Sequence, residues 1–132
     1  HSYLVLSGPD GGATRLGYRE IPGLAPFLGQ ARLVVLSACE SGRPVDAGGE
    51  GVVSIQGLAA QFRRAGVETL VASLWKVDDA GTRALMEAFY EELGQGHDAS
   101  AACARSQRRL ITDPSHGNPW VWAAVVVAGD WR

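Results

Sequence analysis

A single cysteine stands where a buried strand is expected to end, and its position favours nucleophilic chemistry. Residues 33–36 are all apolar, and two small residues separate them from Cys39. In open α/β sheets, ligands bind just beyond the carboxyl ends of the strands. A thiol at that place can be reached by a substrate and can attack a carbonyl carbon. Because the glycine-rich residues 42–51 follow, we expect Cys39 to lie beside a loop.

The alternative for Cys39 is a buried structural thiol, since free cysteine packs as a small hydrophobe. Cys103 falls among alanines on the apolar face of an expected helix, which indicates an inert core residue. The two cysteines show neither a disulfide framework nor the spacing of zinc ligands. We therefore expect a reducing, cytoplasmic setting and no metal cofactor, with calcium at Asp10, Asp46 or Glu50 left open but not favoured.

The elements that must position Cys39 alternate between strand and helix patterns. Strands are expected over residues 3–6, 33–36, 68–75 and 121–128, and helices within 20–28 and over 52–65, 79–93 and 99–111. The main strands are continuously apolar, which is typical of strands that are covered on both faces. The predicted architecture is a three-layer α/β/α sandwich with a mostly parallel sheet.

Composition and charge exclude several classes of protein. The 132 residues suit about one domain, and 46% apolar residues are enough for a packed core. A net charge of −2 without a long basic or acidic block argues against nucleic acid or an anionic membrane as the main partner. No apolar run approaches the roughly 18 residues of a membrane span. The sequence begins at His1 without an initiator Met and enters the strand expected over residues 3–6 within two residues, so we expect a fragment or a processed chain with a neighbour upstream.

Five segments together resemble the CHAT domain family, a caspase-like family in the clan of caspases, separases and gingipains. In chain order they are residues 33–39, 49–51, 65–67, 72–79, and 122–124 followed by Gly129. They extend over nearly the whole chain, and their combination is specific although each segment alone is weak. The resemblance implies one caspase-like domain over residues 1–132 that lacks its N-terminal segment.

The resemblance also implies a cysteine peptidase that works with a histidine–cysteine dyad. Cys39 follows Ser-Ala, as the family's cysteine does, whereas the family's histidine stands in a His-Gly pair at an earlier strand end. No His-Gly pair precedes Cys39 here, so we expect the histidine upstream or on another chain. His1 and His116 are alternatives, although His116 resembles the loop before the last strand. His97 follows glycines between two helices and is expected to be solvated.

In the implied mechanism, a histidine takes the thiol proton and Cys39 attacks a peptide carbonyl. Water then hydrolyses the acyl-enzyme, and the backbone N–H of Cys39 is a candidate oxyanion donor. By resemblance to separases, Asp79 could bind arginine or lysine before the cut, since a carboxylate pairs well with guanidinium. Helix capping, which either Asp78 or Asp79 could perform, is the alternative, and Asp46 and Glu50 are rivals for the pocket.

The expected partners are a protein substrate and a repeat region or regulatory partner upstream, in a bacterial, cytoplasmic protein without direct nucleic acid or membrane contacts. A second interpretation is a non-catalytic interaction or assembly module, because CHAT domains commonly follow tetratricopeptide or other repeat regions and some relatives lack dyad residues. A third is a nucleotide-binding domain, since residues 48–51 form a glycine loop before a helix. No complete phosphate-binding motif accompanies that loop, and no serine-hydrolase elbow is present.

Overall fold

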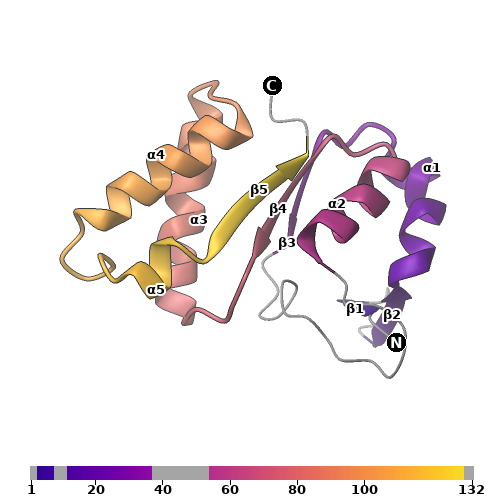
Figure 1. Ribbon diagram of the computed structural model, residues 1–132, viewed down its shortest axis with the longest axis horizontal. Coiled ribbons are helices and arrows are strands. Elements are labelled where there is room, and N and C mark those ends of the chain that lie inside the picture. The colour runs from indigo at the N-terminus through magenta and orange to yellow at the C-terminus, as the bar shows by residue number, and fades with distance from the viewer. Residues whose placement is uncertain (1–2, 8–11, 37–53, 130–132) are drawn as a thin grey trace.

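The computed structural model describes residues 3–7, 12–36 and 54–129 (Figure 1). The first part contains β1 (Tyr3–Ser7), β2 (Ala13–Gly17), the 3-10 helix η1 (Tyr18–Leu24), α1 (Ala25–Leu28) and β3 (Leu33–Leu36). The second part contains α2 (Ile55–Arg64), β4 (Thr69–Ser73), α3 (Asp79–Gly94), α4 (Ala99–Ile111), α5 (Pro119–Trp122) and β5 (Val125–Gly129). An antiparallel hairpin, β1–β2, stands apart from a three-stranded sheet with the order β3-β4-β5.

The three-stranded sheet is mixed, with β4 at its centre. β3 runs parallel to β4, with Leu36 opposite Ala72, and β5 runs antiparallel to β4, with Val125 opposite Ser73. Both strands of a parallel pair end at the same edge of the sheet. The chain therefore leaves β3 and β4 on one side, which we call the carboxyl edge, and Figure 1 shows α3 beginning and α5 lying beyond it.

Helices cover both faces of this sheet, as the continuously apolar strands predict (Figure 1). Successive side chains of a strand point to opposite faces, so the neighbours Leu70 and Val71 of β4 enter different cores. One core joins Val71 to α3, α4 and α5 around Phe89. The other joins Leu70 to α2 and η1 around Phe62 and Ile21. The described chain is thus a mixed α/β structure with a helical layer on each side of its sheet.

The three long helices agree with the predicted ones, and their ends have local causes. A side chain caps the start of each helix: Ser54 caps α2, Asp78 caps α3 and Asp98 caps α4. Such caps accept a hydrogen bond from an otherwise unpaired backbone N–H in the first turn. α2 ends before Gly66, whose φ of +93° suits glycine, as predicted.

The prediction of one strand over residues 121–128 is wrong at its start. Residues 119–122 form the short helix α5, and β5 begins only at Val125. The Asn118 side chain accepts a hydrogen bond from the backbone N–H of Trp120 at 2.9 Å, and Pro119 occupies the first helical position. Proline is well suited to that position because its missing N–H would have no partner there.

Residues 20–28, predicted to hold one short helix limited by two prolines, form parts of two. The 3-10 helix η1 contains Pro22, and α1 has Pro26 in its first turn. Each proline lacks the N–H that a longer helix would need at its position. Among the described residues, no helix has both the length and the apolar character that a membrane crossing requires.

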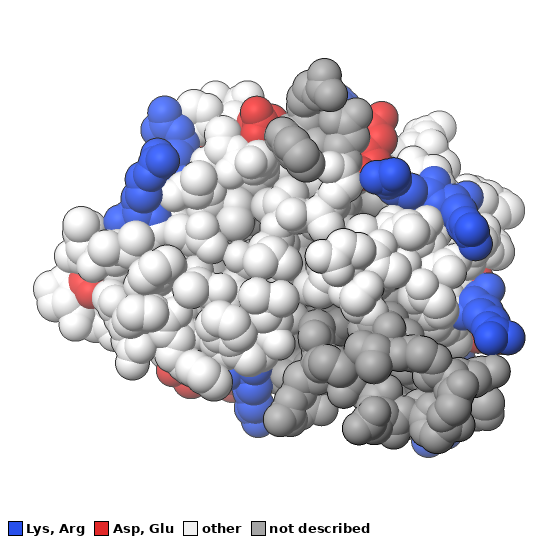
Figure 2. All heavy atoms as spheres, viewed as in Figure 1, with Lys and Arg blue, Asp and Glu red and all other residues white. Residues whose placement is uncertain are grey.

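Charged side chains are distributed rather than gathered on the face that Figure 2 shows. Lys and Arg stand mainly at the rim of this face, and for the described residues they form no continuous basic surface there. One cation at the surface is paired, since Arg32 Nε lies 3.1 Å from the Glu68 carboxylate. Exposed pairs of this kind contribute little to stability.

Candidate active site

The carboxyl edge of the β3–β4 pair is the candidate site, because ligands of α/β sheets bind where parallel strands end. β3 ends at Leu36, and β4 ends at Ser73 one register position beyond the Leu36–Ala72 pair. After Ser73 the chain crosses residues 74–78 and enters α3. β3 and β4 therefore end on the same side of the sheet, and residues 74–78 leave the sheet there.

The expected nucleophile, Cys39, lies outside the described residues. The same holds for His1, the early alternative for the dyad base, and for Asp10, Asp46 and Glu50. The nucleophilic role of Cys39 and the location of its histidine stay predictions.

The two aspartates at the start of α3 differ in what they contact. Asp78 is the N-cap, and its Oδ1 accepts a hydrogen bond from Gly81 N at 2.7 Å. Asp79 is the first helical residue and is exposed, and its carboxylate has no hydrogen bond or ion pair with any other described residue. Capping, which the sequence allows for either aspartate, is thus the function of Asp78. The Asp79 carboxylate is accessible to a cation.

Two tryptophans join the residues after β4 to α5, an arrangement that we call the tryptophan clamp. Trp75 Nε1 donates to the carbonyl oxygen of Trp120 at 2.8 Å, and Trp120 Nε1 donates to that of Lys76 at 3.1 Å. The two indole rings lie 5.2 Å apart between centroids, tilted by 34°. Trp120 is 59% exposed. Tilted aromatic pairs of this kind add stability beyond the area they bury.

The sequence contains Trp75 and Trp120 but does not reveal that they meet. Trp75 belongs to a segment of the family resemblance, whereas Trp120 lies 45 positions further along the chain and just before the last of those segments. Their positions in the sequence could have indicated a contact, since Trp75 stands at the end of one expected strand and Trp120 stands just before the start of another. Because tryptophan N–H groups usually find a partner, two such residues near one sheet edge were candidates for a contact.

α5 is itself attached to its surroundings. Trp122 Nε1 donates to the carbonyl oxygen of Gly117 at 3.1 Å, within the loop before α5. From α4, Gln107 Nε2 donates to the carbonyl oxygens of Trp122 at 3.1 Å and Val125 at 3.0 Å. The bond to Trp122 satisfies a carbonyl group that a four-residue helix leaves without a helical partner, and the bonds to Gly117 and Val125 attach α5 to the segments on either side of it.

His116 contacts its own loop, in agreement with the expectation of loop packing. Its backbone N–H donates to Asp113 Oδ1 at 3.2 Å, and its Nδ1 lies 3.4 Å from Asp113 Oδ2. The backbone N–H of Ser115, and then the His116 side chain, lower the pKa of Asp113. His97 is less solvated than expected, since its side chain is 31% exposed and lies 3.4 Å from the Glu92 carboxylate.

Cys103 is a core residue, as predicted. It is 7% exposed on the inner face of α4, and burial raises the pKa of its thiol. A raised pKa keeps the thiol protonated near neutral pH, where only the thiolate is a good nucleophile. Within residues 3–7, 12–36 and 54–129, no cluster of three or more His, Cys, Asp or Glu is able to hold a metal ion.

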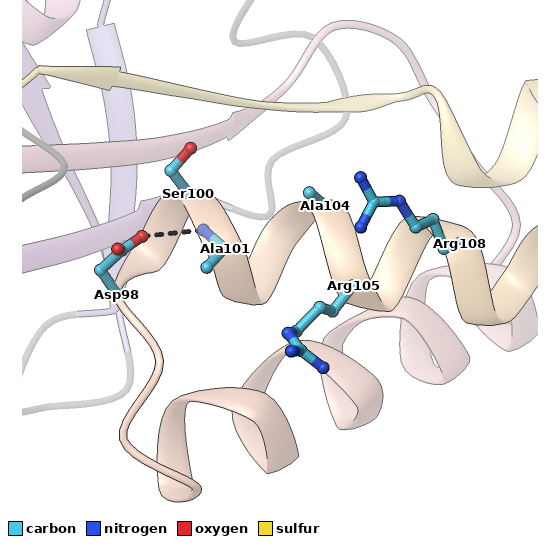
Figure 3. Close-up of a pocket in the computed structure, with 6 residues that line it drawn as sticks. All are labelled: Asp98, Ser100, Ala101, Ala104, Arg105 and Arg108. Carbon is cyan, nitrogen blue, oxygen red and sulfur yellow. Dashed lines mark hydrogen bonds between the residues drawn. The ribbon is translucent and has the colours of Figure 1, made fainter.

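A shallow hollow of about 380 Å³ lies on the outer side of α4 (Figure 3). Its lining residues are Asp98, Ser100, Ala101, Ala104, Arg105 and Arg108. Asp98 is occupied as the cap of α4, with Oδ1 2.8 Å from Ala101 N. Figure 3 shows the guanidinium groups of Arg105 and Arg108 pointing in different directions, so they do not converge on one ligand. The hollow is separate from the carboxyl edge.

The model of the CHAT domain family matches residues 1–130, and the chain therefore belongs to the CHAT domain family. This confirms the resemblance read from the five segments.

Two curated relatives carry the same name. Tetratricopeptide repeat protein 28 of Homo sapiens is 33% identical over 99 residues, which are 74% of this chain and 4% of the relative. Its counterpart from Mus musculus is 29% identical over 101 residues, again 74% of this chain and 4% of the relative. The chain thus spans only a small part of these proteins. No solved structure matches the chain, and a bacterial source stays a prediction.

Proposed function

We propose that the complete domain is a cysteine endopeptidase, with Cys39 as nucleophile and Asp79 as the acid that binds a basic P1 residue. The parallel pairing of β3 with β4 carries this proposal. One strand continues in sequence toward Ser-Ala-Cys, and the other leads to the exposed Asp79 at the same edge. Membership in a caspase-like family supports the same chemistry.

Chain connectivity limits how far Cys39 can lie from the carboxyl edge. Three peptide units separate Leu36, the last residue of β3, from Cys39. Three residues of fully extended chain span at most about 11 Å. Together with the exposed carboxylate of Asp79, this limit supports a nucleophile and a specificity acid that serve one substrate.

The proposed reaction balances with side chains, substrate and water. A histidine, expected upstream of the chain, accepts the proton of the Cys39 thiol as the sulfur attacks the scissile carbonyl carbon. The C–N bond breaks, and the histidine returns the proton to the leaving amine. Water then attacks the thioester, which releases the new carboxylate and restores the thiol. The full domain would be a three-layer caspase-like sandwich in a cytoplasmic protein.

The test is covalent labelling of the full-length protein by an arginyl acyloxymethyl ketone probe. We expect labelling of the wild type, loss in Cys39→Ala, and retention in Cys103→Ala, which removes the buried thiol. Asp79→Asn should lower the labelling rate by about tenfold, the worth of a hydrogen-bonded charge pair, and Asp78→Asn should not. Labelling that survives Cys39→Ala would contradict the nucleophile, and equal effects of the two aspartate variants would contradict the pocket.

The second candidate function is a non-catalytic interaction or assembly module. The name of both curated relatives favours it, since that name describes tetratricopeptide repeats. We propose that a repeat region or regulatory partner lies upstream here as well. The sequence of the full-length protein separates the two candidates. A His-Gly pair shortly before His1 supports the peptidase. Its absence, with no labelling by probes of any P1 residue in the presence of the natural partner, supports the module.

A further inference from the structure

We infer that Trp120, on α5, is a positioning residue for the Asp79 carboxylate. This inference rests on the proposed function, because it concerns the geometry with which Asp79 meets a basic substrate residue. Trp120 would act through the backbone between β4 and α3 and would not touch the reacting atoms.

The residues that place Asp79 form a connection without regular structure. Residues 74–78 link β4 to α3, and Asp79 is the first residue after them. A loop of this kind is more mobile than the elements it joins unless other contacts hold it. Its backbone is held at the start, where Leu74 N–H donates to the carbonyl oxygen of Ala124 at 2.7 Å.

The tryptophan clamp holds the middle of this connection. Trp120 Nε1 reaches a backbone carbonyl, that of Lys76, so the bond restrains the main chain three residues before Asp79. Trp75 Nε1 returns a bond to the Trp120 backbone, and the two rings pack against each other. Two reciprocal bonds fix both the separation and the relative orientation of the two segments, which a single bond would leave free to rotate.

Close packing transmits the position of α5 to the first turn of α3. A Cβ atom at Gly81 would lie 2.8 Å from Val121 Cγ1 and 3.1 Å from Val77 Cγ1. Only glycine therefore lets this turn approach α5 so closely. Asp79 lies between two fixed points, the Lys76 carbonyl on one side and Gly81 on the other.

The test compares two conservative variants in the full-length protein. Trp120→Phe keeps an aromatic ring and loses the N–H that reaches Lys76. Trp122→Phe is the matched control, since it loses an indole N–H whose bond to Gly117 stays within the loop before α5. For an arginyl peptide substrate we expect Trp120→Phe to raise KM about threefold to tenfold, with a smaller change in kcat. Trp122→Phe should change KM by less than twofold.

A double-variant cycle separates positioning from general loosening. If Trp120 acts through Asp79, Trp120→Phe should add nothing to the KM of Asp79→Asn. Additive effects, or equal KM values for the two phenylalanine variants, would overturn the inference and leave the proposed function intact. Should Trp120→Phe fail to fold, Trp75→Phe breaks the reciprocal bond and carries the same expectation.

Amide hydrogen exchange gives a readout that needs no substrate. Residues 74–81 should exchange faster in Trp120→Phe than in Trp122→Phe, because only the first variant frees the Lys76 carbonyl. Suppose that residues 74–81 exchange faster in Trp120→Phe but the wild-type protein cleaves no peptide. The tryptophan clamp would then exist in a protein that is not a peptidase. That result would contradict the proposed function and, with it, the positioning of a substrate acid. Equal exchange in the two variants would contradict the clamp itself.

Discussion

Cys103 lies on the inner face of α4, where burial raises the pKa of its thiol above the ordinary value of 9.0. Well below pH 9 the thiol is protonated in both the folded and unfolded chains, so its contribution to stability is fully present. As the pH rises further, the unfolded chain loses this proton first, and the free energy of unfolding falls.

This pH dependence can be measured against Cys103→Ala. Urea unfolding between pH 8 and 10.5 should show a steeper loss of stability in the wild type, by less than about 1.4 kcal/mol per pH unit. The variant retains Cys39 and all other titrating groups, so the difference between the two curves reports Cys103 alone. Parallel curves would mean that the thiol titrates alike in the folded and unfolded chains.

The roles of Asp78 and Asp79 could be predicted from the sequence only in part. The resemblance points to Asp79 as an acid that could bind substrate, but the sequence alone does not divide capping from binding between two adjacent aspartates. That division depends on the backbone conformation of Asp78, which is extended and lets its side chain turn back to Gly81 N. Asp79, one position later, already belongs to the helix, where its side chain points outward.

Among the elements, α3 contains two glycines whose surroundings differ. A Cβ at Gly81 would lie 2.8 Å from Val121 Cγ1, whereas a Cβ at Gly94 would meet nothing within 4 Å. Gly81→Ala should therefore lower the free energy of unfolding by about 1–3 kcal/mol, because overpacking outweighs the better helix propensity of alanine.

Gly94→Ala is the matched substitution in the same helix. It should raise the free energy of unfolding by up to about 1 kcal/mol, since alanine favours the helix and restricts the unfolded chain. Chemical denaturation of the two variants measures both values. A Gly81→Ala protein as stable as Gly94→Ala would show that α5 moves away from α3 without cost.

The long elements could be predicted from sequence because their determinants are local. The periodic apolar face of α4 and its cap, Asp98, lie within a few residues of each other, and the same is true of α2. α5 and β5 could not be delimited in this way, since residues 121–128 are almost uniformly apolar. α5 is stabilised partly by Gln107 on α4, whose side-chain amide donates a hydrogen bond to the carbonyl oxygen of Trp122. The antiparallel direction of β5 likewise depends on where α5 turns the chain.

For the whole molecule, β4 is the structural link between two cores. Leu70 belongs to the core under α2, and Val71 belongs to the core under α3 and α4. A strand shared in this way cannot leave one core and stay in the other, so we expect the two faces to unfold in one transition.

Leu58→Ala tests this coupling, because Leu58 lies on the α2 face while Trp75, Trp120 and Trp122 lie near α3 and α5. Removing a buried leucine side chain should cost about 2–5 kcal/mol. Tryptophan fluorescence should report the full shift of the unfolding midpoint, together with far-ultraviolet circular dichroism. A fluorescence midpoint that stays at the wild-type value would show that the two faces unfold separately.

The paired indoles also give the molecule an optical property. Two identical chromophores whose centres lie 5.2 Å apart and whose planes are tilted by 34° share their electronic transitions, and such a pair in a chiral setting produces a split circular dichroism band. The band depends on the separation and relative angle of Trp75 and Trp120. It would weaken whenever α5 and the end of β4 move apart. The protein therefore contains an unlabelled spectroscopic reporter at the edge where its chemistry is proposed to occur.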